Sequence, residues 1–562
     1  MIVGIDFGTS TSEIAYTNEE GLPVVIPNHL GEVVTPSVVY MDEHHQPVVG
    51  EAAREKLLLE PQNTVIEIKR LLGTSETITI RDKVYRPVEI ASYIMAYLVE
   101  CASKHLGQPV TRAVITVPAF STDAQRRATI TAGELAGLSV ERLINEPTAA
   151  SLDYGVERRA DCNHLLVYDF GGGTFDVTVL ELFEGVLDVN ASAGNNQLGG
   201  LNIDERLINH MVTHIKKKNK INIVEDLQAA TRLKKAAEAC KIELSMSTVC
   251  DVELPFLSTD KKGNPVGYSE HFTREVFNGL INDLIISTRE QVDTVLNDAL
   301  LKPDQIDFVL LVGGTTKIPY VREFLETELG FTVKSHQDPV LSVVRGAAIE
   351  GGIIEGRYNE AALVLTDVAP YSLSTEVLRR GALAGTYCDI LIKRNKTIPT
   401  SVSKIYQTAH DHQSAVAITV YQGESEDPDE NILLGDLTLK GIPKAKAGKE
   451  DIKITFSYDL NGLLVVEGEI LSNGKSLIAE INTSNSAGEI NPDDWVHSTQ
   501  ARKYRSVINK GEKILQTNLD DPDLFDDIQK TLVNLKRGLV LEQSAQLLDT
   551  FKDELLDLYS EV

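Results

Sequence analysis

The chain has 562 residues and a formal net charge of −28, with 42% apolar and 24% charged residues. This length corresponds to about four domain-sized units, so a single small module is excluded. The composition is that of a globular chain with several cores, and the negative charge disfavours nucleic acid and anionic membrane surfaces as partners. The N-terminus lacks the pattern of a secretory signal, and no apolar run is long enough to span a bilayer, so we expect a cytoplasmic protein.

Residues 1 to about 360 alternate short β-branched runs with helical stretches such as residues 123–137 and 225–245. This alternation predicts layers of α-helices and β-sheet, that is, an α/β domain. From residue 363 to about 482 the pattern changes to short runs with period-two alternation, separated by turn signals such as Asn461-Gly462. Such a pattern predicts a separate β-sandwich.

The C-terminal part is predicted to be a small helical unit. Asn491-Pro492 has the form of an N-cap followed by the first helical residue, so a helix is expected to begin there. Four apolar residues then recur at helical spacing: Ile528, Leu532, Leu535 and Leu539.

The tripeptide Asp-Phe-Gly occurs twice, at Asp6-Phe7-Gly8 and at Asp169-Phe170-Gly171. Each copy follows an apolar strand and precedes small residues and a second strand, which predicts one hairpin in each half of a duplicated domain. Glycine lets backbone N–H groups approach an anion closely, and Thr and Ser add hydroxyl donors. Two facing hairpins of this kind would clamp a polyphosphate.

An aspartate ends the first strand of each predicted hairpin, beside the expected phosphates. A carboxylate there needs a bridging cation such as Mg²⁺, so we expect Asp6, Asp169 and Asp176 to hold the metal, largely through water. In a purely structural interpretation the Gly-Thr turns join strands and the Asp residues cap them, but this does not account for the duplication. The motif G-x-x-x-x-G-K-[ST] is absent, which excludes a P-loop site.

These motifs resemble the DnaK family of heat-shock chaperones, and the resemblance covers nearly the whole chain. It implies an actin-like duplicated ATPase domain over residues 1–360, an interdomain linker over residues 361–367, a β-sandwich substrate-binding domain over residues 368–483 and a shortened helical lid over residues 484–562. The short lid and several local phrases are most similar to the HscC branch. The implied function is an ATP-dependent chaperone that binds extended apolar segments of unfolded or specific client proteins.

The resemblance also implies the nucleotide site, with ATP or ADP and Mg²⁺ as cofactors. Lys69 would orient the attacking water and offset charge on the γ-phosphate, while Glu146 and Asp176 accept the water's hydrogen bonds and Thr174 completes the catalytic set. The residues implied to bind nucleotide are Gly8, Thr9, Ser10, Thr11, Gly171, Gly172, Gly173, Gly199, Gly200, Glu238, Lys241, Ser245, Gly313, Gly314, Thr315 and Lys317.

Two further sets of residues follow from the resemblance. Those implied to couple nucleotide state to the second domain, or to receive a J-domain co-chaperone, are Pro118, Arg126, Arg142, Asn145 and Asp367. Those implied to line a peptide groove are Tyr406, Ala409, Val416 and Ile418. The groove would bind an extended chain through backbone hydrogen bonds. The expected partners are client polypeptides, a J-domain co-chaperone and a nucleotide exchange factor, with no nucleic acid or membrane.

The sequence departs from the family pattern at three positions. Lys317 replaces an arginine that stacks on adenine, and lysine stacks less well, which predicts lower nucleotide affinity. Val340 stands where the family has an acidic residue, so an acidic contact near the adenosine pocket is missing. Thr375 occupies a usually apolar groove position, which leaves the substrate preference open. Two other functions would use the same clamp: an actin-like scaffold or filament ATPase, and a sugar kinase. Neither needs the linker or the sandwich.

Overall fold

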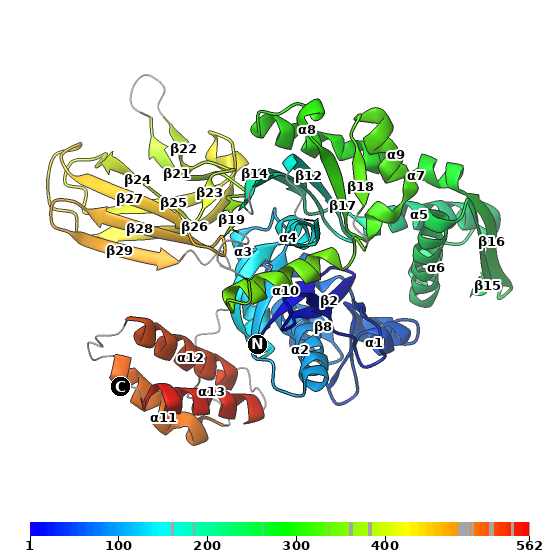
Figure 1. Cartoon of the computed structure of the whole chain (residues 1–562), viewed down its shortest axis with the longest axis horizontal. Coiled ribbons are helices and arrows are strands. Elements are labelled where there is room, and N and C mark those ends of the chain that lie inside the picture. The colour runs from blue at the N-terminus through cyan, green and yellow to red at the C-terminus, as the bar shows by residue number, and fades with distance from the viewer. Residues whose placement is uncertain are drawn as a thin grey trace.

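Figure 1 shows a two-lobed α/β part in blue to green, a β-rich part in yellow and a helical unit in orange to red. The computed structural model describes residues 1–158, 162–183, 186–260, 262–335, 338–358, 364–379, 385–480, 495, 500–515, 522–540 and 545–560. Among the described helices, none combines the length and the apolar character that crossing a membrane requires.

The first lobe is built on a sheet with the order β11-β10-β1-β2-β3, in which β4 also pairs with β2. Its strands are β1 (Ile2–Phe7), β2 (Thr11–Thr17), β3 (Pro23–Val25), β4 (Thr35–Pro36), β10 (Arg112–Val117) and β11 (Ser139–Asn145). Strands β1, β10 and β11 run parallel, while β1 and β2 form an antiparallel hairpin. Helices α2 (Pro87–Leu106) and α3 (Asp123–Leu135) pack on one face and share its apolar core.

Short elements extend the first lobe between β4 and α2. They are β5 (Val39–Met41), β6 (Pro47–Val49), α1 (Glu51–Lys56), β7 (Thr64–Val65), the 3-10 turn η2 (Ile68–Leu71), β8 (Ile78–Ile80) and β9 (Lys83–Tyr85). Strands β6, β5 and β7 form one small sheet and β8 and β9 another. This extension carries η2 to the edge of the interlobe cleft.

The second lobe repeats the plan with a sheet of order β18-β17-β12-β13-β14-β19. Its strands are β12 (Cys162–Phe170), β13 (Phe175–Phe183), β14 (Val186–Asn195), β17 (Phe308–Val312), β18 (Val333–Ser335) and β19 (Val364–Leu365). Helices α4 (Glu146–Arg158) and α10 (Ser342–Ile354) lie between the two sheets, where Ala149, Val343 and Ala347 share a core with residues of both. The predicted duplication, with one hairpin in each half, is confirmed by β1–β2 and β12–β13.

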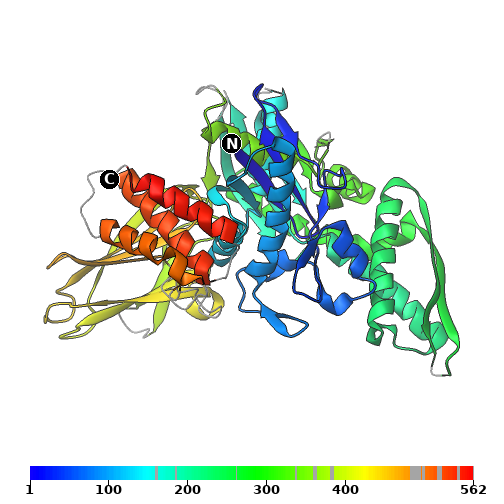
Figure 2. The same cartoon turned by 90° about the horizontal axis from the view of Figure 1, so that it is seen from below.

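An arm projects from the second lobe, at the end opposite the β-rich part (Figures 1 and 2). It consists of α5 (Gly200–Asn219), α6 (Leu227–Met246), the antiparallel pair β15 (Val249–Thr259) and β16 (Pro265–Thr273), and α7 (Arg274–Ser287). The helices α8 (Arg289–Asp298) and α9 (Pro319–Glu323) lie nearer the lobe's sheet. The arm and the sheet share one continuous apolar core, so α6 is held at a fixed place beside the cleft.

The β-rich part contains two four-stranded antiparallel sheets, with the orders β22-β21-β25-β26 and β24-β27-β28-β29. Their strands are β21 (Leu373–Leu378), β22 (Thr386–Ile392), β24 (Thr400–Gln407), β25 (Ala415–Gln422), β26 (Ile432–Lys440), β27 (Asp451–Tyr458), β28 (Leu464–Ile470) and β29 (Lys475–Glu480). Both sheets contribute to one core. The predicted hairpin at Asn461-Gly462 is confirmed, since it joins β27 to β28 and Gly462 has a φ of 68° that suits glycine.

The helical unit contains α11 (Ala501–Leu515), α12 (Pro522–Val540) and α13 (Ala545–Leu558). The four apolar residues predicted to share a helical face, Ile528, Leu532, Leu535 and Leu539, are all buried in its core, together with Trp495. The helix start predicted at Asn491-Pro492 lies outside the described residues.

The segment that joins the α/β and β-rich parts is held by strand pairing at two points. Strand β19 adds in parallel to the edge of the second lobe's sheet, with Val364 opposite Val186. Strand β20 (Asp367–Val368) pairs with β23 (Thr397–Ile398) of the β-rich part. The described part of this segment therefore lies between the two parts as bound β-structure.

Candidate nucleotide site and domain interface

The tips of the two equivalent hairpins face each other across the interlobe cleft. A Cβ added to Gly172 would lie 2.3 Å from Oγ of Ser10, and one added to Gly173 would lie 2.6 Å from Oγ1 of Thr9. A side chain at Gly173 would displace Thr9, because Oγ1, Cγ2 and Cβ of Thr9 would all lie within 3.0 Å of the added Cβ. A Cβ added to Gly199, just before α5, would lie 2.4 Å from the carbonyl oxygen of Gly172.

Between these loops lies about 530 Å³ of empty space, which we call the phosphate cleft. Its lining comes from both lobes and contains most of the residues predicted to bind phosphate. The lining residues are Asp6, Gly8, Thr9, Ser10, Thr11, Glu13, Lys69, Glu146, Asp169, Gly171, Gly172, Thr174, Gly313, Gly314, Pro339, Val340 and Val343.

Three buried aspartates stand in or beside the phosphate cleft. Asp6 accepts a hydrogen bond from Oγ1 of Thr116 at 2.8 Å, and Asp176 accepts one from the backbone N–H of Phe120 at 3.1 Å. Burial, reinforced by the charge of Glu146, raises the pKa of both Asp6 and Asp176 to about 7. Burial also raises the pKa of Asp169 well above its usual range. This concentration of carboxylates favours a bound cation.

The remaining oxygens fit such a cation. One carboxylate oxygen of Asp169 and one of Asp176 are buried without a hydrogen-bond partner among the described residues. Buried acceptors of this kind are usually satisfied by an ordered water, a ligand or an ion. No three Asp, Glu, His or Cys side chains of the described residues converge closely enough to hold a bare ion. Mg²⁺ held largely through water and phosphate oxygens is consistent with both observations.

Lys69 forms an ion pair with Glu146, with 2.6 Å between Nζ and Oε1. Lys69 lies on η2 in the first lobe's extension, Glu146 begins α4, and their side chains are 10% and 12% exposed. The structure thus brings together two residues far apart in sequence that were predicted to act on one water. The neighbouring Arg70 was not predicted; its guanidinium donates to the carbonyl of Gly173 at 3.3 Å and to Asn202 at 3.4 Å, which connects the two lobes.

The residues predicted to hold adenosine are less tightly gathered. Thr315 donates to the carbonyl of Gly171 at 2.8 Å, and Gly313 has a φ of 83° that suits glycine. Lys241 donates to Asp204 at 2.9 Å, while Ser245 donates to the carbonyl of Lys241. Lys241 and Ser245 line neither the phosphate cleft nor the larger cavity beside it. Lys317 lies 4.0 Å from Asp338.

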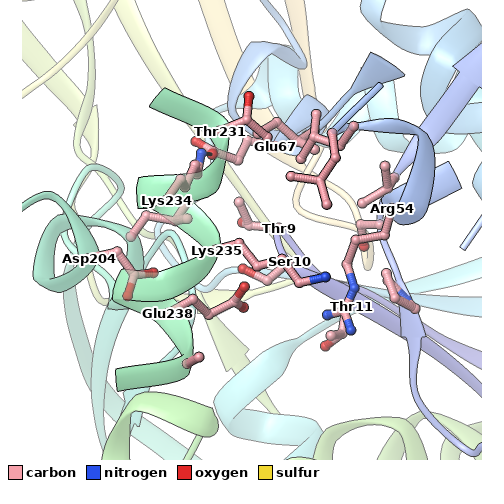
Figure 3. A pocket seen from close by; sticks show the side chains of 18 of the residues that line it. Thr9, Ser10, Thr11, Arg54, Glu67, Asp204, Thr231, Lys234, Lys235 and Glu238 are labelled. Carbon is pink, nitrogen blue, oxygen red and sulfur yellow. Dashed lines mark hydrogen bonds and ion pairs between the residues drawn. The ribbon is translucent and has the colours of Figure 1, made fainter. Parts of the chain in front are cut away.

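The larger cavity, of about 1100 Å³, lies between α6 and the first lobe's extension. Figure 3 shows Lys235 and Glu238 on α6 pointing across it toward Arg54, with Thr9, Ser10 and Thr11 between them. Lys234 forms an ion pair with Glu67, which joins α6 to the first lobe. Of the predicted adenosine contacts, Glu238 faces this cavity.

The β-rich part contacts the first lobe through Arg126. Its guanidinium is buried and donates to Oδ1 of Asn145 at 2.7 Å and to the carbonyl of Asn461 at 3.2 Å. Asn145 in turn donates to Asp367 at 2.6 Å. Three of the residues predicted to couple the domains therefore form one hydrogen-bonded chain. Arg142 instead forms an ion pair with the buried Glu350.

The turn at Asn461-Gly462 inserts against the first lobe. Oδ1 of Asn461 accepts from the backbone N–H of Leu143 at 2.9 Å, and the N–H of Leu464 donates to Asp123 at 2.9 Å. Arg127 donates to the carbonyl of Leu464 at 3.0 Å. These contacts, like Arg70, were not predicted from the sequence.

A second contact joins the β-rich part to the other lobe. Arg394 forms an ion pair with Asp298 at 2.8 Å, and Asn395 donates to the same carboxylate at 2.9 Å. The side-chain oxygen of Asn395 accepts from the N–H of Ser192 at 3.2 Å. The β-rich part is thus bonded to both lobes that form the phosphate cleft.

The four residues predicted to line a peptide groove differ in exposure. Ile418 is fully buried in the core, Tyr406 and Val416 are partly buried against that core, and Ala409 is exposed. The hydroxyl of Tyr406 donates to Asp389 at 2.8 Å, and Lys404 pairs with the same carboxylate at 2.7 Å. Thr375 is buried, so this polar replacement lies within the protein.

Comparison with known proteins agrees with these features. The family model described as Hsp70 protein matches residues 2–557. The chaperone protein DnaK of Thermotoga petrophila is 41% identical, and the match covers 95% of this chain and 88% of that protein. DnaK of Thermosipho melanesiensis is 38% identical, and the match covers 99% of this chain and 92% of that protein. A nucleotide cleft between two lobes that is bonded to a β-rich part is the arrangement expected of an ATP-dependent chaperone. The chain belongs to the Hsp70 family.

The chain is therefore an ATPase and an ATP-dependent chaperone of unfolded client proteins. The family relationship does not favour the filament or scaffold alternative. The relatives are DnaK chaperones, and the resemblance to the HscC branch stays a prediction.

Proposed function

We propose that ATP in the phosphate cleft controls an extended-peptide groove in the β-rich part. Residues 1–360 would form the nucleotide-binding domain, residues 361–367 the linker, residues 368–483 the substrate-binding sandwich and residues 484–562 a short lid. The two facing four-stranded sheets and the separate helical core support this division. We further propose a cytoplasmic location, as predicted from the sequence.

Hydrolysis is assigned to the residues that meet in the cleft. Lys69 would hold the attacking water and offset charge that develops on the γ-phosphate oxygens, while Glu146 fixes the position of the Lys69 ammonium through their 2.6 Å contact. Asp176 would accept a hydrogen bond from the same water, and the backbone of the glycine loops would hold the phosphates. Asp6, Asp169 and Asp176 would hold Mg²⁺, largely through water, and the ion would supply positive charge that offsets the charge of the phosphate oxygens.

One observation carries the proposed coupling. Asp176, which lies beside the phosphate cleft, and the β-rich residue Tyr371 both bond to the backbone of Phe120, at 3.1 Å and 2.9 Å. A change in the position of Asp176 on hydrolysis would therefore act on a residue that the sandwich contacts. The chain of Arg126, Asn145 and Asp367 offers a second connection between the first lobe and the joining segment.

The groove residues and partners belong to the same proposal. Tyr406, Ala409, Val416 and Ile418 would contact an extended apolar segment of the client, with backbone hydrogen bonds along β-strand edges. A J-domain co-chaperone would bind near Arg142, Asn145 and Asp367, which lie where the first lobe meets the joining segment. A nucleotide exchange factor is a further proposed partner.

ATP turnover with Mg²⁺, with and without a short extended apolar peptide, tests the proposal on the intact chain and on Lys69→Ala. We expect peptide to raise a slow basal rate, and Lys69→Ala to lower turnover by about 100-fold or more. Turnover that depends on Lys69 but ignores peptide would separate the cleft from the sandwich and contradict the coupling.

A further inference from the structure

The turn that carries Lys69 is bonded to the opposite lobe on both sides of that lysine. On one side, Glu67 forms an ion pair with Lys234 of α6. On the other side, the guanidinium of Arg70 donates to the carbonyl of Gly173, at the tip of the second lobe's hairpin, at 3.3 Å. Two contacts across the cleft therefore flank the residue that is proposed to act on the γ-phosphate, and the proposed mechanism gives neither of them a role.

Glu67 has a backbone conformation that residues other than glycine rarely adopt. It stands immediately before η2 with φ and ψ of 59° and 24°, in the left-handed region. A residue with a Cβ is strained in this region, and such strain persists only where surrounding contacts hold it. The carbonyl of Glu67 accepts from the backbone N–H of Arg70 at 3.0 Å, which closes the turn around Lys69. The conformation of Glu67 therefore sets the geometry of the turn.

The two lobes share the task of holding this turn. Ile68 and Leu72 are buried in the first lobe's core, so they fix the place of η2 within that lobe. The carboxylate of Glu67, whose side chain is 24% exposed, reaches the second lobe instead. Its Oε1 pairs with Nζ of Lys234, and its Oε2 lies 3.9 Å from Nη1 of Arg70. The strained residue at the start of the turn is thus held by a partner in the opposite lobe.

We propose that Glu67 is a positioning residue for Lys69, and that Lys234 holds Glu67 in the reacting conformation only while the cleft is closed. When the lobes separate, Glu67 loses this partner and its backbone relaxes, which moves the ammonium of Lys69 away from Glu146. ATP bound in an open cleft is then hydrolysed slowly, because the lysine is not yet in place. This inference rests on the proposed role of Lys69 in hydrolysis.

The test separates hydrolysis of bound ATP from ATP binding. The dissociation constant for ATP is measured first, and single-turnover hydrolysis is then followed with Mg²⁺ and an excess of the full chain above that constant. We expect Glu67→Gln and Lys234→Met each to lower the rate constant about tenfold, a smaller loss than in Lys69→Ala. The dissociation constant should change by no more than about threefold. Because the two residues act as a pair, the double variant should be about as slow as either single variant.

Two matched controls remove the same charges at exposed positions. They are Glu55→Gln on α1, in the same extension of the first lobe, and Lys217→Met on α5. Both should hydrolyse bound ATP at the unsubstituted rate.

A different result would overturn the inference. If Glu67→Gln and Lys234→Met bind ATP more weakly but hydrolyse bound ATP at the unsubstituted rate, the ion pair only holds the lobes together. Losses that add in the double variant would show that the two residues act separately. If Lys69→Ala also hydrolyses bound ATP at the unsubstituted rate, the proposed role of Lys69 is wrong and the inference falls with it.

Discussion

The hydroxyl of Tyr371 donates a hydrogen bond to the backbone carbonyl of Phe120 at 2.9 Å, and their ring centroids lie 4.3 Å apart. Tyr371 belongs to the β-rich part and Phe120 to the first lobe. The amide of the same Phe120 donates to Asp176, which lies beside the phosphate cleft. A single backbone position thus contacts a proposed catalytic carboxylate and the domain that the cleft is proposed to control.

Tyr371→Phe should weaken the coupling while leaving the cleft intact. The ring contact stays and one hydrogen bond is lost, which corresponds to about 1 kcal/mol, or roughly a fivefold shift in the balance between contacting and separated domains. We expect the basal ATP turnover to stay within about twofold of the unsubstituted rate. The stimulation of turnover by an apolar peptide should change severalfold.

Tyr320→Phe is the control for this measurement. Tyr320 lies on α9, away from the β-rich part, and donates to Asn282 within the second lobe. It should leave peptide stimulation unchanged. If Tyr371→Phe also leaves stimulation unchanged, Phe120 does not transmit the signal.

The pKa of Asp176 predicts how the stability of the nucleotide-free protein depends on pH. Burial raises this pKa from 3.8 to about 7, so the folded protein binds the proton more tightly than the unfolded chain. The associated stabilisation is fully present below pH 3.8 and is lost as the pH rises through about 7. Asp176→Asn should therefore raise the free energy of unfolding at about pH 8 by up to ~4 kcal/mol. The decrease in this free energy as the pH rises from about 5 should be smaller in the variant.

Thermal unfolding of the nucleotide-free chain at several pH values checks this prediction. The amide oxygen of Asn can still accept from Phe120, so the substitution removes charge more than contact. Asp304→Asn, at an exposed carboxyl of the second lobe, serves as the comparison. A steeper fall with pH in Asp176→Asn than in the unsubstituted chain would show the opposite sign and refute the account.

The helical unit has a packing contact that tolerates no side chain. A Cβ added to Gly511 on α11 would lie 2.2 Å from the hydroxyl oxygen of Tyr559 and 3.2 Å from Leu532. Tyr559 is buried and donates to the carbonyl of Val507 at 3.0 Å, which limits its movement. Gly511→Ala should therefore destabilise this unit by about 1–2 kcal/mol, after the better helix propensity of alanine is included.

Trp495 is the single tryptophan of the chain and is buried in the core of the helical unit, so its fluorescence reports unfolding of that unit. The denaturant midpoint seen by fluorescence should fall in Gly511→Ala. Gly279→Ala provides the contrast, since Gly279 lies on α7 with open space around it. An unchanged midpoint in Gly511→Ala would mean that the helices pack differently.

Local patterns in the sequence are enough to predict three hairpins and one buried helix face. The repeated Asp-Phe-Gly predicts β1–β2 and β12–β13 because a strand, a glycine turn and a second strand are adjacent in the chain. Asn461-Gly462 predicts its hairpin for the same reason. The spacing of Ile528, Leu532, Leu535 and Leu539 predicts a buried helix face, since it matches the helical repeat.

Contacts between segments far apart in the sequence could not be predicted from local patterns. Arg126 reaches Asn461, and Lys234 pairs with Glu67, only because the domains and lobes are folded against each other. No local pattern encodes such partners. Glu13, which lines the phosphate cleft, could have been predicted from the duplication, because it follows Asp6 at the same spacing at which Asp176 follows Asp169.

The central claim is that the nucleotide in the cleft sets how long the β-rich part retains a peptide. The most direct test is the dissociation rate of a fluorescent apolar peptide from the full chain after mixing with Mg-ATP or with Mg-ADP. We predict release at least about tenfold faster with ATP, which corresponds to an activation free energy for dissociation that is lower by about 1.4 kcal/mol or more. Equal release rates with the two nucleotides, in a chain that binds both, would contradict the account.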